Sequence, residues 1–200
     1  MRLIKYAVVV PARNEEKYIE GTLIALKNQT IPPDQIIVVD DGSKDRTGQI
    51  ASKYADIVVR LPDRGHNALR KPELAEVVNE GLRRVKKDVD YVLICGADHV
   101  LPKEYFEAVI SRMKANPKMV VASGRIRGEP YYEFGPDGSG RVVDTKFWRE
   151  VSDLQYPLEW GWESWLFYKA MQLGYEVRRF RDVVTEVQRP TTLGKAMLSG

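Results

Sequence analysis

Two neighbouring carboxylates stand directly behind an apolar run in the stretch IIVVDDGSKDRTGQI, residues 36–50. Asp40 and Asp41 repel each other, so their side-by-side placement lowers stability unless a ligand or another group in the site offsets the repulsion. The same letters, Asp-Asp-Gly-Ser, also favour a tight turn followed by a helix cap. These residues alone leave two interpretations open, a ligand site or a plain turn.

Two more polar segments follow apolar runs in the same way. PARNEE (11–16) comes after YAVVV, and GADHVLP (96–102) comes after YVLIC. In open α/β sheets, ligands bind beyond the carboxyl ends of the parallel strands. Three such segments in this order therefore indicate one ligand site at that edge of the sheet.

Apolar runs of strand length alternate with helical patterns along the chain. Strands are expected at residues 6–10, 36–40, 57–61, 91–95 and 119–123, with two closing strands at 175–180 and 183–187. Helices are expected from about Glu15 with Asn14 as the N-cap, over 45–54, from Pro72, around Phe106 to Met113, and over 163–173 before Gly174. Runs that are apolar throughout are typical of strands covered on both faces. The sequence therefore predicts an α/β fold with a mostly parallel central sheet and helices on both faces.

The segment 124–141 breaks this regularity, because it contains five glycines and two prolines. Glycine and proline at this density predict a long loop. Long loops in compact domains tend to be functional. We expect this one to be a lid over a bound ligand.

Composition narrows the class of protein. The 200 residues are 44% hydrophobic, enough for one domain with a sizeable core, and the formal net charge is only +3. That charge is too small to predict nucleic-acid binding. The single cysteine, Cys95, excludes an internal disulfide and a zinc site built from cysteines. No apolar run approaches the roughly 20 residues of a membrane-spanning helix, and no signal peptide is recognised, so a cytoplasmic protein is expected.

The three polar segments and their flanks, VVVPARNEEKYIEGTLIAL, IIVVDDGSKDRTGQIA and ICGADHVLP, resemble glycosyltransferase family 2. The resemblance extends from Ile4 to Gly174. Members of this family are inverting nucleotide-sugar transferases with the fold called GT-A. The resemblance implies a single glycosyltransferase-like domain over residues 1–200, with a nucleotide-binding half at about 1–102 and an acceptor half at about 103–190.

The resemblance assigns the donor nucleotide to the loops after the first two strands. A carboxylate accepts the N–H of uracil or guanine through a charge-assisted hydrogen bond, and Asp41 is expected to do so with Asp40 beside it. The expected donor is a UDP- or GDP-linked sugar, with Arg64 or Arg70 near its nucleotide. The other nucleotide-binding residues implied are Pro11, Ala12, Arg13, Glu15, Ala97 and Asp98.

The family's metal-binding motif is Asp-x-Asp, and this chain has Gly96-Ala97-Asp98 in its place. Magnesium sites that include substrate phosphates often use only one or two protein carboxylates. Asp98 alone is therefore expected to hold the Mg²⁺ or Mn²⁺ ion. Gln188 replaces a late histidine that also binds the metal in many members, and His99 is expected to be structural.

An acid at the start of the last helix is the expected catalytic base. Counting back eleven positions from Gly174 places Glu163 at the family's catalytic position. Inversion needs a base that takes the proton of the acceptor hydroxyl, whereas a glutamate that only stabilises the helix start is the alternative. Trp160, Trp162 and Trp165 are candidate acceptor-site residues, because aromatic faces stack on sugar rings, although tryptophan here is as often part of the core.

The residues and the resemblance together predict an inverting, metal-assisted transfer of a sugar from a nucleotide-diphosphate donor to a hydroxyl of a lipid or glycan acceptor. Because the acceptor is not defined, peripheral association with the inner face of a membrane stays open. One alternative is a non-catalytic module, derived from a transferase, that binds a nucleotide-sugar or a glycan. A sugar-phosphate nucleotidyltransferase is a further alternative, but PARNEE lacks the glycine that its phosphate loop requires.

Overall fold

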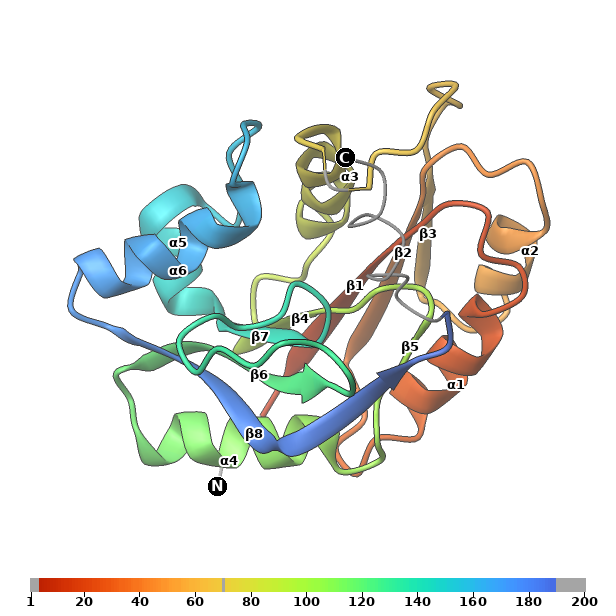
Figure 1. Ribbon diagram of the computed structural model, residues 1–200. Coiled ribbons are helices and arrows are strands. Elements are labelled where there is room, and N and C mark those ends of the chain that lie inside the picture. The colour runs from red at the N-terminus through yellow and green to blue at the C-terminus, as the bar shows by residue number, and fades with distance from the viewer. Residues whose placement is uncertain (1–3, 70, 190–200) are drawn as a thin grey trace, which may run out of the picture.

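One sheet of eight strands runs through the computed structural model, which describes residues 4–69 and 71–189 (Figure 1). The strands are β1 Tyr6–Ala12, β2 Gln35–Asp40, β3 Ile57–Arg60, β4 Tyr91–Ile94, β5 His99–Val100, β6 Met119–Ile126, β7 Arg141–Asp144 and β8 Glu176–Val187. They lie in the order β3-β2-β1-β4-β7-β6-β8-β5. The sheet is mixed: β3, β2, β1 and β4 are parallel, whereas β7 runs antiparallel to β4 and β6. At the other end, β6 and β8 are parallel and β5 is antiparallel to β8.

Helices cover both faces of this sheet, as the sequence predicts. They are α1 Ile19–Lys27, α2 Thr47–Ala51, α3 Glu73–Leu82, α4 Tyr105–Ala115, α5 Thr145–Ser152 and α6 Trp162–Gln172. Alternate residues of β1 point to opposite faces, so Tyr6, Val8 and Val10 pack with α1, α2 and α4 in one core cluster. Ala7 and Val9 belong to a second cluster with α3, α5 and α6. Figure 1 shows α3, α5 and α6 above the sheet and α4 below it.

The loops after β1 and β2 are hydrogen-bonded to each other. Asn14 is not the N-cap of α1, which begins only at Ile19. Asn14 has a φ of 54°, and its side-chain oxygen accepts a hydrogen bond from the N–H of Lys44 at 2.9 Å. The N–H of Glu15 donates to the hydroxyl of Thr47 at 2.7 Å. The prediction of an N-cap was wrong because a partner distant in sequence takes the side chain that would have capped the helix.

Several element boundaries also differ from the prediction. The two expected closing strands are one strand, β8, whose register with β6 shifts between Arg179 and Val184. The helix expected over 45–54 is only the short α2, and β6 extends into the expected loop as far as Ile126. The remaining glycine-rich loop therefore covers residues 127–140.

Two elements after this loop were not predicted. β7 has only four residues, too few to show a period, and it supplies Arg141 to the interior. α5 follows at once, and the carboxylate of Asp144 caps it by accepting a hydrogen bond from the N–H of Phe147 at 2.9 Å. In the described part of the chain, no helix combines the length and apolar character that a membrane crossing needs.

Candidate active site

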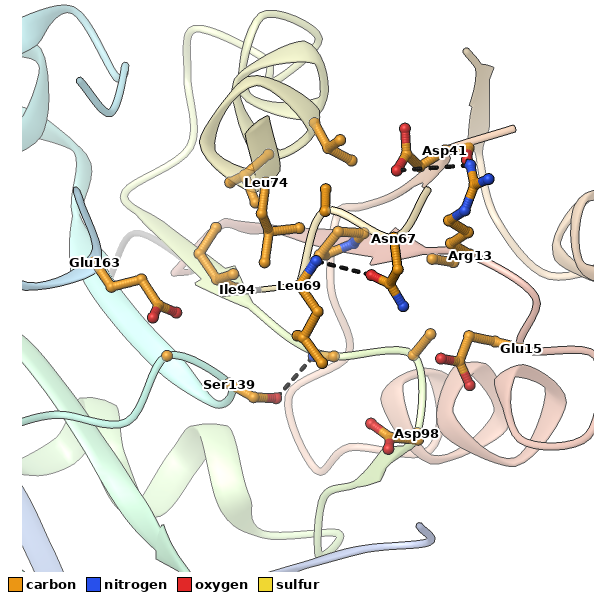
Figure 2. A pocket seen from close by; sticks show the side chains of 18 of the residues that line it. Arg13, Glu15, Asp41, Asn67, Leu69, Leu74, Ile94, Asp98, Ser139 and Glu163 are labelled. Carbon is orange, nitrogen blue, oxygen red and sulfur yellow. Dashed lines mark hydrogen bonds and ion pairs between the residues drawn. The ribbon is translucent and has the colours of Figure 1, made fainter. Parts of the chain in front are cut away.

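A cavity of about 250 Å³ lies beyond the carboxyl ends of β1 and β4. Figure 2 shows Asp41 and Arg13 on one side and Glu163 on the opposite side, with Leu69 and Ile94 between them. Most of the residues predicted from the sequence line this cavity: Pro11, Ala12, Arg13, Glu15, Asp41, Ala97, Asp98, Trp162 and Glu163. The fold thus brings the three polar segments and the start of α6 to one place.

Three predicted site residues do not line the cavity. A carboxylate oxygen of Asp40 accepts a hydrogen bond from the N–H of Ser43 at 3.0 Å, so this carboxylate holds the turn. Trp160 is 77% exposed on the segment before α6, and Trp165 packs against the second core cluster. Asp40 therefore faces the turn, and Trp165 takes the core position that was the alternative to an acceptor role. Trp160 lies outside the cavity, and its acceptor role stays a prediction.

Asp41 faces the cavity as a buried carboxylate paired with arginine. Arg64 donates a hydrogen bond from Nε to its Oδ1 atom at 2.9 Å, and Nη2 of Arg64 lies 2.8 Å from the same oxygen in an ion pair. Arg13 lies on the other side, with Nη1 at 4.0 Å from Oδ2, and donates to the carbonyl oxygen of Asp41. The protein's own arginines therefore offset the repulsion between Asp40 and Asp41 before any ligand binds. Arg70, the other expected arginine, lies outside the described residues.

The loop containing Asp98 is held from two directions. The hydroxyl of Thr22 on α1 donates to the carbonyl oxygen of Ala97 at 2.9 Å. From the other side, the N–H of Gly96 donates to the hydroxyl of Ser139 at 2.7 Å. The glycine-rich loop 127–140 therefore supports the Asp98 loop and lines the cavity through Gly138 and Ser139.

The same hydroxyl contacts His99, which is only 1% exposed. Its Nδ1 lies 2.5 Å from the hydroxyl of Ser139, and burial lowers the pKa of the imidazole to about 4. A buried, neutral histidine with this contact is structural, as the sequence predicts, and it does not line the cavity.

The start of α6 is fixed by a buried arginine. Arg141 donates from Nη1 to the carbonyl oxygen of Glu163 at 2.9 Å and to the hydroxyl of Tyr156 at 3.1 Å. Trp162 packs edge-on against Tyr156, with ring centroids 4.9 Å apart. Glu163 therefore has a fixed backbone while its carboxylate stays exposed at the cavity.

Gly138 of the glycine-rich loop lies directly against that carboxylate. A Cβ atom at position 138 would stand 2.5 Å from Oε1 of Glu163, closer than any real contact. Only glycine leaves this space for the carboxylate. The loop thus helps to set where the predicted base lies.

Asp98 and Glu15 approach each other at the remaining side of the cavity, with Arg189 between them. Arg189 forms an ion pair with Glu15, and its Nε lies 4.0 Å from Oδ2 of Asp98. Burial raises the pKa of Glu15 above its ordinary value, and the charge of Asp98 adds to this, while Arg189 opposes it. The cluster combines two acids that repel each other with one cation that stabilises both.

These residues offer little to a resident metal ion. Among the residues that the structure describes, no group of three His, Cys, Asp or Glu side chains is arranged to hold one. Gln188, expected in place of a histidine ligand, instead donates from its amide to the carbonyl oxygen of Tyr18 at 3.0 Å. Asp98 is left as a single carboxylate ligand, so phosphate and water oxygens would have to complete any coordination shell.

Several cavity residues were not predicted. An apolar wall comes from α3 and the segment before it: Ala68, Leu69, Leu74, Val77 and Val78. The sequence predicts a helix from Pro72, but its apolar pattern does not distinguish side chains that pack on the sheet from side chains that line a cavity. Gly138 and Ser139 lie in the segment that was predicted as a loop, and neither had a predicted role. Arg189 follows Gln188, the only residue at this strand end for which a role was predicted.

Comparison with solved structures defines the class of fold. The mannosyltransferase PcManGT from Pyrobaculum calidifontis, solved with GDP-Man and Mn²⁺, has a TM-score of 0.77 and 21% identity, over 94% of this chain and 57% of that one. TarS of S. aureus, residues 1–349, solved with UDP, has a TM-score of 0.70 and 21% identity, over 92% of this chain and 60% of that one. The sheet and its helical layers are those of a GT-A fold.

The sequence comparison then gives the family. The profile described as Glycosyl transferase family 2 matches residues 7–174, and the chain belongs to that family. The probable glycosyltransferase YdaM of Bacillus subtilis (strain 168) is 28% identical over 134 residues, which are 62% of this chain and 30% of that relative. The uncharacterized protein MJ1222 of Methanocaldococcus jannaschii is 38% identical over 117 residues, 53% of this chain and 46% of that relative. The matches thus span less than half the length of these curated relatives.

Proposed function

We propose that this chain is a glycosyltransferase that moves a sugar from a nucleotide-diphosphate donor to an acceptor hydroxyl, with inversion at the anomeric carbon. One observation carries the proposal: Asp41, Asp98 and Glu163, from three distant segments, line a single cavity. Family membership supports the reaction class. The fold neighbours solved with UDP and with GDP-Man support a UDP- or GDP-linked donor.

The nucleotide is proposed to lie between the β1 loop and α3. Arg64 occupies Oδ1 of Asp41, so Oδ2 is the oxygen that accepts an N–H of the base. Leu74 and Val78 offer an apolar surface to the flat face of the base. In this arrangement residues 1–102 supply most of the nucleotide site, and residues 103–190 supply the acceptor side.

Glu163 is proposed as the catalytic base. The acceptor oxygen attacks the anomeric carbon from the side opposite the diphosphate, and the bond from that carbon to the diphosphate oxygen breaks. The bonding electrons leave with the nucleoside diphosphate, and the acceptor proton passes to the carboxylate of Glu163. General-base catalysis of this kind typically contributes 10²- to 10⁴-fold to the rate.

Asp98 is proposed to hold a Mg²⁺ or Mn²⁺ ion that enters with the donor, because the diphosphate oxygens supply ligands that the described side chains lack. The ion would stabilise negative charge on the leaving diphosphate. The acceptor hydroxyl, on a lipid or glycan, is proposed to enter beside the exposed Leu158 and Trp160, which precede α6. A lipid acceptor would bring this side of the protein to a membrane surface.

The test separates binding from turnover. Affinities for UDP, GDP and CMP are measured by calorimetry, and turnover is measured as nucleoside diphosphate released from panels of UDP- and GDP-linked sugars. We expect one nucleotide to bind, Asp41→Asn to weaken it roughly tenfold or more through loss of a charge-assisted hydrogen bond, and Glu163→Gln to keep binding while losing at least 10²-fold in turnover.

Glu150→Gln is the matched control, because Glu150 is an exposed acid on α5 that does not line the cavity. Its turnover should equal that of the wild type. Binding of a nucleotide without turnover on any donor or acceptor would instead favour the non-catalytic module. Absence of binding by all three nucleotides would overturn the proposed donor site.

A further inference from the structure

Arg189 is a cation that the fold itself places beside Asp98. Its guanidinium lines the cavity, pairs with Glu15, and lies over the ring of Tyr18 with its central carbon 5.3 Å from the ring centroid. The side chain is 44% exposed, so part of it faces the open cavity. An arginine that pairs closely with Glu15, lies 4.0 Å from Asp98 and keeps an exposed edge can still bind a further anion.

The backbone before Arg189 is tied down on the cavity side. The N–H of Gln188 donates to the carbonyl oxygen of Asp98 at 2.7 Å, and β5 pairs with β8 through His99 and Val187. The amide of Gln188 donates to the carbonyl oxygen of Tyr18 on the opposite side. These contacts hold the Arg189 backbone next to the Asp98 loop, which keeps the guanidinium within reach of this end of the cavity.

Arg64 and Arg13, which the structure describes near the same cavity, are already ion-paired with acids. Arg64 donates to Asp41 and contacts Glu76, and Arg13 bridges Asp41 and Asp63. Arg189 is the arginine at the Asp98 end, where the proposed donor carries its diphosphate. A guanidinium presents several N–H donors in a planar fork that matches phosphate oxygens.

Resting on the proposed function, we infer that Arg189 binds the donor diphosphate directly and supplies the positive charge that a metal ion beside Asp98 would otherwise supply alone. On donor binding, the guanidinium exchanges part of its contact with Glu15 for contact with the phosphate oxygens. Nucleotide binding by the wild type is then largely independent of divalent metal. Removal of Arg189 makes that binding depend on a metal held by Asp98.

The experiment measures the affinity for the preferred nucleoside diphosphate, UDP or GDP, in EDTA and again in Mn²⁺. The proteins are wild type, Arg189→Gln, Arg189→Lys and a control, Arg112→Gln. Arg112 pairs with Asp182 and lies over the ring of Phe180 at 4.6 Å, so the control loses the same charge and the same kinds of contact outside the cavity. Thermal midpoints of all four proteins show whether each is folded.

The wild type and Arg112→Gln should bind within about threefold of each other in either buffer. Arg189→Gln should bind roughly tenfold or more weakly in EDTA, the effect expected for a lost charge-assisted hydrogen bond, and should regain most of this affinity in Mn²⁺. Arg189→Lys should fall between them, because lysine keeps the charge but not the fork. The nucleoside alone, uridine or guanosine, should bind all four proteins equally.

Wild-type binding that disappears in EDTA would overturn the inference while leaving the donor site intact. So would an Arg189→Gln variant with unchanged affinity in EDTA. If neither diphosphate binds the wild type in either buffer, the proposed function and this inference fall together.

Discussion

Gly138→Ala gives the sharpest test of how the glycine-rich loop positions Glu163. The added Cβ would stand 2.5 Å from Oε1 of Glu163, whereas ordinary contacts begin at 3.4 Å, so the carboxylate must withdraw by about 1 Å. The atom that must move is the end of a flexible side chain, so the fold itself is not strained. A displacement of this size in a reacting group can cost about 10²-fold in rate.

The assay is release of nucleoside diphosphate from whichever sugar donor the panel of UDP- and GDP-linked sugars identifies. Nucleotide affinity is measured in parallel. We expect kcat for Gly138→Ala to fall about 10²-fold, toward that of Glu163→Gln, while nucleotide affinity stays within about twofold. Gly135→Ala is the matched control in the same loop, because its Cβ would make only ordinary contacts, with the Cβ of Tyr132 at 3.6 Å and its carbonyl oxygen at 3.9 Å. Equal turnover by Gly138→Ala and Gly135→Ala would refute the reasoning, since the carboxylate would then need no fixed position.

Two further predictions concern stability. The pKa of His99 is lowered to about 4 by burial, so between pH 4 and the ordinary value near 6.5 the unfolded chain binds more protons and stability falls as the pH falls. Wild type should lose about 2 kcal/mol of unfolding free energy from pH 7 to pH 5 through this group. Urea denaturation at the two pH values should show this loss in His66→Gln, whose native histidine is exposed, but not in His99→Gln. An equal change in the free energy of unfolding with pH in the two variants would contradict the prediction. For the cap of α5, Asp144→Ala should be about 1 kcal/mol less stable than Asp144→Ser, because serine can still accept the N–H of Phe147; equal thermal midpoints would show that the cap adds nothing.

The layered fold was predictable because its strands are buried on both faces. Runs such as YAVVV and IIVVD have no polar face, and only a sheet with helices on both sides buries them completely. The antiparallel strand β7 escaped prediction for the opposite reason. Its four residues follow a glycine-rich loop, and their pairing with β4 and β6 depends on residues far away in the chain.

The candidate site was predictable where motifs follow strands and unpredictable where tertiary packing decides. Asp41 and Asp98 stand at strand ends, so their convergence follows from the parallel order of β1, β2 and β4. The family resemblance, and not the local residues, favoured Asp41 over Asp40, because the two differ only in which side of the turn their carboxylates occupy. Arg189 carries no local signal, since its place beside Asp98 comes from the pairing of β5 with β8.

The hydrogen bonds between the loops after β1 and β2 limit which segments can be exchanged with a relative in order to alter donor preference. Asn14 and Glu15 are matched to Ser43, Lys44 and Thr47 across the gap between two strands. A transplanted first loop would meet a second loop whose hydroxyls and N–H groups suit a different partner. The two loops therefore form one transferable unit, and variation at either is constrained by the other although about thirty residues separate them in sequence.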